Sequence, residues 1–387
     1  MRKPISPIER QPRYKQLDGL RGVAAVTVFF GHYMSIKIHE PLYSTLYPTP
    51  IAVLFNGNAA VMFFFVLSGF VLSLPFIDNK KPLSLAEFYL KRFFRIFPAF
   101  IFAIIFSVVL KEFVFDKNGM LSFSEWIKAS WMWGWNKESV KEILKTFLLI
   151  GPHFNENFID QTIWSLIIEM KMSIILPFFI IIAARGGVVF NVIFLFVITS
   201  LSYDHQYWAL PIFYLGVLSA KYKWQIISEI RKLNLIYVFA AFLVAIFLYN
   251  NAWELSHFHM QIKSPDKITC SNYFVAIGSG IIMFIVMARE KLSRILESSF
   301  FTFLGNISYS FYLIHFPLLL TMASLFSARF SYSLFYIFSL TIIAAFVVGY
   351  LMFIFIERPF QRFAARLVGK YKILSALKIG TKEALST

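Results

Sequence analysis

Long apolar blocks separated by short connections constrain this chain more than any other feature. A helix needs about 20 mostly apolar residues to cross a bilayer. Ten stretches meet this description: residues 17–34, 58–77, 94–112, 161–184, 187–203, 205–220, 234–250, 272–288, 302–326 and 332–356. Only 15% of the 387 residues are charged and 58% are hydrophobic, whereas a soluble domain has about 25% charged residues. The sequence therefore predicts an all-α polytopic membrane protein with about ten transmembrane helices. The fifth and sixth stretches lie so close together that a hairpin of short helices fits them equally well.

The basic residues predict the orientation of these helices. If the N-terminus is cytoplasmic, the inside connections and termini hold 25 Lys and Arg residues and the outside connections hold 10. The positive-inside rule then places both termini in the cytoplasm, which requires an even number of spans. The net charge of +16 lies in these short connections, which indicates contact with anionic lipid rather than with nucleic acid. The single cysteine, Cys270, excludes an intramolecular disulfide.

The chain divides into three parts in this layout. A basic cytoplasmic leader covers residues 1–16, the ten-helix membrane domain covers 17–356, and a basic cytoplasmic tail covers 357–387, lying on the inner leaflet or disordered. The long outer loop, 113–160, carries His153 and four tryptophans: Trp126, Trp131, Trp133 and Trp135. This tryptophan cluster fits either an interfacial aromatic belt or a platform that stacks sugar rings.

The first span contains ionisable residues on one stripe. Charged groups within a membrane helix are costly and mark functional sites. Arg21 and His32 are 11 positions apart, so they share a helix face and lie roughly 16 Å apart along the axis. A structural interpretation remains open for both, with Arg21 reaching the headgroups beside Asp18 and His32 packed between helices.

A second group of cations begins the third span. Arg92 and Arg95 are one turn apart and share a face, at the same predicted depth as Arg21. They fit either an ordinary positive-inside anchor or a phosphate site at the cytoplasmic edge, because arginine forms forked hydrogen bonds to phosphate.

Polar residues also interrupt three other spans. Ser165 and Glu169 share a face of the fourth span, and Tyr312 and His315 lie on one stripe of the ninth. Helical rise predicts an outer-middle layer of polar side chains. Its members are His32, Ser68, Glu169 and His315. Two histidines and a glutamate could in principle hold a metal, but no two share a local ligand motif, so we expect no metal.

Six segments occur in order along the chain. They are 17–21 with His32, 63–70, 92–98, 164–166 with Glu169 and Pro177, 308–317, and 357–360. In these segments the chain resembles the acyltransferase-3 family, the integral-membrane acyltransferases that O-acetylate bacterial glycans. The chain departs from the family at Val61-Met62, where many members carry a polar residue before the double phenylalanine.

The resemblance implies a membrane O-acyltransferase in a bacterial inner membrane. Acetyl-CoA would be the cytoplasmic donor, and the acceptor would be a hydroxyl of a surface glycan or a lipid-linked saccharide, such as lipopolysaccharide, at the outer face. The family's functional residues would fall on Arg21, His32, Arg92 and Arg95. Some members carry a C-terminal hydrolase-like domain that this sequence lacks, so the acyl group would pass directly or through a separate periplasmic transferase.

These residues predict a mechanism. Arg21, Arg92 and Arg95 would bind the phosphates of coenzyme A, and His32 would act as general base or briefly take the acyl group. The remaining predicted site residues would orient the imidazole, hold the oxyanion or contact substrate. They are Glu169 and His315, with Ser68, Trp164, Tyr309 and Tyr312 as substrate contacts. The alternatives are a transporter or flippase of an anionic solute that uses the same Arg/His/Glu path, or a structural or sensor membrane protein.

Overall fold

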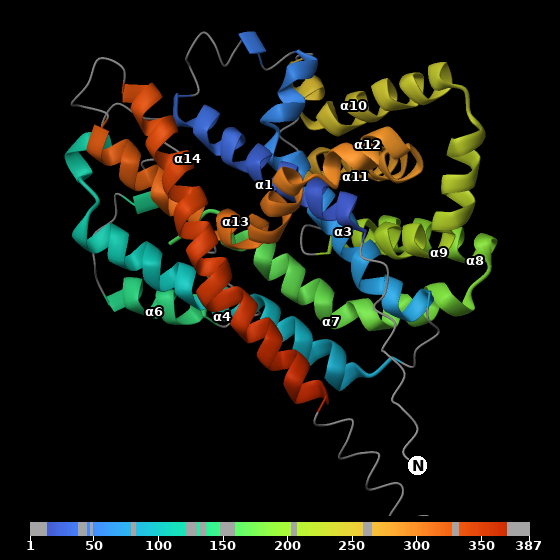
Figure 1. Cartoon of the computed structure of the whole chain (residues 1–387), viewed down its shortest axis with the longest axis horizontal. Coiled ribbons are helices and arrows are strands. Elements are labelled where there is room, and N and C mark those ends of the chain that lie inside the picture. The colour runs from blue at the N-terminus through green and yellow to red at the C-terminus, as the bar shows by residue number, and fades with distance from the viewer. Residues whose placement is uncertain are drawn as a thin grey trace, which may run out of the picture.

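The computed structural model is all-helical wherever it describes the chain, as predicted (Figure 1). The described residues are 14–37, 45–46, 49–78, 83–120, 130–131, 137–147, 159–202, 207–257, 265–326 and 333–369. Each predicted span overlaps one helix. In chain order these are α1 (Lys15–Met34), α3 (Gly57–Ile77), α4 (Leu85–Phe113), α7 (Ile163–Arg185), α8 (Val188–Leu201), α9 (Leu210–Lys232), α10 (Leu235–His257), α11 (Pro265–Ala288), α13 (Ser299–Phe326) and α14 (Ser333–Met352). Short helices are η1 (Ser35–Lys37), η2 (Pro50–Leu54), η3 (Lys117–Met120), α6 (Lys137–Thr146), α12 (Glu290–Leu296) and the π-helix η4 (Phe353–Glu357).

Several of these helices could cross a membrane. In the described part of the chain, six helices are long and apolar enough, and 188–201 and 235–250 are shorter apolar helices. Their outward faces are apolar: Val189, Phe196 and Leu235, for example, are each 72% exposed. This pattern suits contact with lipid and supports a multi-pass membrane protein. The count of ten crossings and the side of the termini remain predictions.

Helix directions agree with the predicted layout. α1 runs parallel to α13, because Gly22 lies against Gly305 while His32 lies against His315. α4 runs antiparallel to α7, since the hydroxyl of Tyr89 donates to the carbonyl of Ile174 while Arg92 reaches back to Glu169. Parallel first and ninth spans and antiparallel third and fourth spans are what an alternating chain requires.

Two predicted boundaries are wrong. α4 begins at Leu85 rather than at 94, because the side chain of Ser84 accepts a hydrogen bond from the N–H of Glu87 and caps the helix. At the other end, the last helix does not stop at 356 but continues through the π-turn to 369. Glu357, predicted to begin the basic tail, is only 2% exposed inside this helix. Hydropathy alone misses both extensions, because both carry charged residues.

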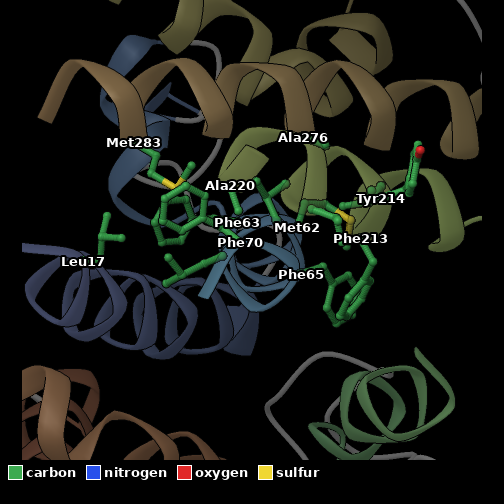
Figure 2. Close-up of a cluster of buried hydrophobic side chains, with 14 of the residues drawn as sticks. Leu17, Met62, Phe63, Phe65, Phe70, Phe213, Tyr214, Ala220, Ala276 and Met283 are labelled. Carbon is green, nitrogen blue, oxygen red and sulfur yellow. The ribbon is translucent and has the colours of Figure 1, made fainter. Parts of the chain in front are cut away.

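The main core lies where α3 passes between α1, α9 and α11. Figure 2 shows side chains from these helices meeting in one cluster. It includes Leu17, Met62, Phe63, Phe65, Phe70, Phe213, Tyr214, Ala220, Ala276 and Met283. A second cluster joins α4, α7, α13 and α14. α1 and α13 run side by side between these two clusters, at the centre of the molecule (Figure 1), which places their polar residues inside the bundle.

Facing glycines allow α3 and α9 to pack closely. A Cβ added to Gly216 would overlap the carbonyl oxygen of Val66 and lie 2.9 Å from the Cα of Gly69. Small residues at such crossings are how membrane helices bring their backbones together. The prediction that Gly69 allows close packing is therefore confirmed.

We expect Gly216→Ala to lower the free energy of unfolding by about 1–3 kcal/mol, because the added methyl group has no space between the two backbones. Gly280→Ala in α11 is the matched control, since nothing lies within 4 Å of its Cβ. Melting temperatures of the purified proteins in detergent measure the difference. Equal melting temperatures for the two variants would contradict the close crossing.

Candidate active site

A pair of histidines joins α1 to α13. The Nδ1 atom of His32 lies 2.9 Å from the Nε2 atom of His315, and the two rings stack with centroids 5.1 Å apart. His315 is fully buried, and its Nδ1 atom lies 2.7 Å from the backbone carbonyl oxygen of Tyr312. The predicted proximity of His32 and His315 is therefore present.

These contacts determine which nitrogen of each neutral imidazole carries the proton. A carbonyl oxygen only accepts, so Nδ1 of His315 donates to Tyr312 and its Nε2 is the acceptor. Nδ1 of His32 must then donate to His315. The lone pair of neutral His32 is consequently on Nε2, where it can accept a proton.

His32 lines a small cavity, the histidine cavity, of about 200 Å³. Its walls include His32, Asn56, Asn58, Val61, Trp164 and Tyr312. This volume is below the roughly 300–1,000 Å³ of common small-molecule pockets. The cavity therefore suits a small reacting group rather than a whole nucleotide.

A second, larger cavity, the arginine cavity, occupies about 1150 Å³ among α1, α3, α4, α7, α13 and η4. Its walls include Arg21, Ser68, Arg92, Arg95, Glu169 and Glu357, together with Tyr309. The structure thus brings together the three arginines that the sequence placed at one depth. The cavity is large enough for a ligand of nucleotide size.

Each of these arginines has a carboxylate partner. The pairs are Arg21 with Asp18 (3.1 Å), Arg92 with Glu169 (2.7 Å) and Arg95 with Glu357. Arg92 also donates to the hydroxyl of Ser173 through Nε and Nη2, at 3.0 and 2.8 Å. A guanidinium has five N–H donors, so a carboxylate partner leaves room for hydrogen bonds to an anion in the cavity.

A family model described as an acyltransferase domain matches residues 14–356. The chain belongs to the acyltransferase-3 family. The chain matches no curated protein and no solved structure. The match includes both cavities except for the residues after 356, and it identifies a membrane acyltransferase. It gives no support to the transporter or flippase alternative.

Two acyltransferase residues were assigned to the wrong depth. Glu169 and Ser68 were predicted beside the histidines, but both line the arginine cavity. Glu169 pairs with Arg92, so it does not orient an imidazole. The reason is that α4 starts nine residues earlier than predicted, which carries Arg92 about two turns into the helix. A carboxylate within the membrane then pairs with the nearest cation.

The predicted substrate contacts lie at different cavities. Trp164 lines the histidine cavity, while Ser68 and Tyr309 line the arginine cavity. The hydroxyl of Tyr309 donates to the backbone carbonyl of Ile96 at 2.9 Å. Arg95 lies over the ring of Tyr309, with its guanidinium carbon 5.1 Å from the ring centroid.

Glu357 and Asn58 were missed as site residues. Glu357 accepts hydrogen bonds from Ser310 at 2.7 Å and from Gln361 at 3.1 Å besides pairing with Arg95. A carboxylate at the end of a long apolar block was the available signal, but the block was thought to end one residue earlier. Asn58 precedes an apolar stretch and looks like a helix start, yet it lines the histidine cavity.

Most of the predicted tryptophan cluster lies outside the described residues, as do His153, residues 1–13 and residues 370–387. Trp131 is described and is fully buried, with its Nε1–H donating to the carbonyl of Ile159 at 2.8 Å. This tryptophan therefore does not present an open face to a sugar. Among the described residues, no three His, Cys, Asp or Glu side chains gather in a metal-binding arrangement.

Asp160, just before α7, should make stability depend on pH. Burial raises the pKa of Asp160 to about 7, although the N–H of Thr162 donates to its carboxylate at 2.9 Å and opposes the shift. The folded state then holds this proton more tightly than the unfolded state. Stability is therefore expected to fall as pH rises from about 4 to about 7, by at most about 1.4 kcal/mol per pH unit.

Melting temperatures of wild type and Asp160→Asn across this pH range provide the test. The variant has no charge to bury, so its curve should be flatter and should lie above that of wild type at the alkaline end. Curves that stay parallel throughout would contradict the assignment.

Proposed function

We propose that this acyltransferase moves an acetyl group from acetyl-CoA, bound in the arginine cavity, to a hydroxyl group that reaches His32 in the histidine cavity. The observation that carries the proposal is the hydrogen-bond chain from His32 through His315 to the carbonyl of Tyr312, which leaves the lone pair of His32 on Nε2. A histidine with this tautomer is a general base for a hydroxyl nucleophile.

The reaction balances with these groups alone. Nε2 of His32 takes the proton of the acceptor hydroxyl while the hydroxyl oxygen attacks the thioester carbonyl carbon. The tetrahedral intermediate collapses by breaking the carbon–sulfur bond. The departing thiolate of coenzyme A then takes the proton back from the His32 imidazolium, and the ester leaves with the acceptor.

Arginine chemistry supports the donor assignment. Arg21, Arg92 and Arg95 line one wall system of a cavity of about 1150 Å³. Their forked N–H groups suit the phosphates of coenzyme A. Binding would proceed by sharing or exchanging the hydrogen bonds now made to Asp18, Glu169 and Glu357.

The acceptor we favour is a cell-surface glycan or a lipid-linked saccharide at the outer face of a bacterial inner membrane. The excess of basic residues in the predicted inner connections supports this orientation, with the donor on the cytoplasmic side. A separate periplasmic transferase could receive the acetyl group in place of a direct acceptor.

The test uses the purified full chain in liposomes with bacterial membrane glycan and two labelled forms of acetyl-CoA. With the label in the acetyl group, we expect alkali-labile label on the glycan. With the label in the adenine, we expect the label to stay soluble. Entry of the adenine label into the liposomes without ester formation would instead favour transport, and absence of glycan ester would overturn the proposal.

A further inference from the structure

The two cavities are separated by a thin partition. Tyr312 on α13 and Val61 on α3 line both cavities. On α7, the neighbouring residues Trp164 and Ser165 line opposite sides, Trp164 the histidine cavity and Ser165 the arginine cavity. The boundary between the cavities therefore lies at the level of Val61, Ser165 and Tyr312.

A hydrogen bond between helices closes this partition. The hydroxyl of Tyr312 lies 2.7 Å from the hydroxyl of Ser165, which joins α13 to α7. Phe64 supports the tyrosine ring edge-on, with centroids 6.0 Å apart. The apolar side chain of Val61 stands in the same layer. This is the position at which the chain departs from the polar residue that the resemblance leads us to expect.

We propose that Tyr312, Ser165 and Val61 form a gate between the arginine and histidine cavities. The inference rests on the proposed function in one respect: the thioester end of the donor must pass this layer to reach His32. Opening requires only that the Tyr312–Ser165 bond breaks and the tyrosine ring turns aside. Both hydroxyls can then exchange hydrogen bonds with the amides of the donor's thin arm.

Such a gate also separates the two sides of the membrane when no donor is bound. The arginine cavity is about six times larger than the histidine cavity, and an open connection between them would form a continuous polar path. The tyrosine ring and the valine side chain are bulky and apolar where that path is narrowest. The gate therefore prevents leakage as well as selecting a slender substrate.

Thiol labelling from each side of the membrane tests the gate without any need for turnover. The only cysteine is Cys270, so Cys270→Ser supplies the background. Into it we place Ser68→Cys for the arginine cavity and Ser35→Cys for the histidine cavity. A small, charged, membrane-impermeant methanethiosulfonate is added to right-side-out or inside-out vesicles. Each cysteine should react from one side only, and the two from opposite sides.

Opening the gate should remove this sidedness. Tyr312→Ala should allow both cysteines to react from both sides. Tyr312→Phe and Ser165→Ala keep most of the bulk, and should raise the rate of reaction from the wrong side about tenfold, the change that loss of one hydrogen bond produces. They keep the test decisive if the alanine variant at 312 does not fold. Tyr309→Phe, which loses the bond to Ile96 outside the partition, should leave sidedness unchanged.

Three outcomes would overturn the gate. They are reaction of both cysteines from one side in the background protein, unchanged sidedness in the Tyr312 and Ser165 variants, and loss of sidedness in Tyr309→Phe. Because labelling requires no acceptor and no acyl transfer, failure of the gate and failure of the proposed acyltransferase reaction are distinguishable.

Discussion

Acyl transfer is expected to fall about 10²–10⁴-fold when His32 is replaced by alanine, the range that a general base typically contributes. The imidazole supplies the only nitrogen lone pair that the hydrogen-bond chain directs away from His315. Donor binding should change little, because the arginine cavity does not include His32. The loss should therefore appear in kcat rather than in the KM for acetyl-CoA.

His315 provides the control, since we assign it a positioning role. In His315→Gln, the side-chain oxygen can still accept the proton of His32 Nδ1, whereas in His315→Phe nothing accepts it. We expect the glutamine variant to retain much more activity than the phenylalanine variant, again through kcat. Melting temperatures show whether each variant folds. Wild-type rates in either His32→Ala or His315→Phe would exclude the proposed base and its orientation.

Replacing Arg92 alone is expected to destabilise the protein and to weaken donor use. Arg92 is 8% exposed, and its partner Glu169 has a side chain that is 24% exposed. Removing one member of a buried ion pair leaves the other charge without compensation and costs about 3–5 kcal/mol. Because Glu169 is partly exposed to the cavity, we expect about 2–4 kcal/mol for Arg92→Met.

The double variant Arg92→Met/Glu169→Leu separates stability from function. Replacing both members by apolar residues of similar size is often neutral, so the melting temperature should recover. Acetyl-CoA use should not recover, because the guanidinium that we assign to a donor phosphate is still absent. A double variant with wild-type KM for acetyl-CoA would remove Arg92 from the donor site. A single variant with wild-type stability would show that the ion pair contributes little.

Much of the site could be anticipated from local spacing. Arg21 and His32 were predicted on one stripe of a helix, and each lines a cavity in the bundle. Asp18 was the expected partner of Arg21 and lies 3.1 Å from it. Both results depend on helical periodicity within one segment, which the order of residues specifies directly.

Contacts between segments could not be anticipated in the same way. Rise per residue gives depth only if the helix start and tilt are known. An error in the start of α4 was therefore enough to place Glu169 beside the histidines instead of beside Arg92. The role of Glu357 was hidden for a related reason, because hydropathy ends the last span before the π-turn that carries this carboxylate into the arginine cavity.

The sequence by itself determined the all-helical membrane architecture, because apolar blocks of this length must satisfy their backbone hydrogen bonds internally when they lie in lipid. It also carried enough ordered motifs to indicate the acyltransferase-3 family. Only the tertiary structure decided that His32 donates to His315, which carboxylate each arginine meets, and that Tyr312 and Val61 divide one path into two cavities. These are contacts between helices far apart in the chain, and they depend on how the helices cross and pack rather than on any period within them.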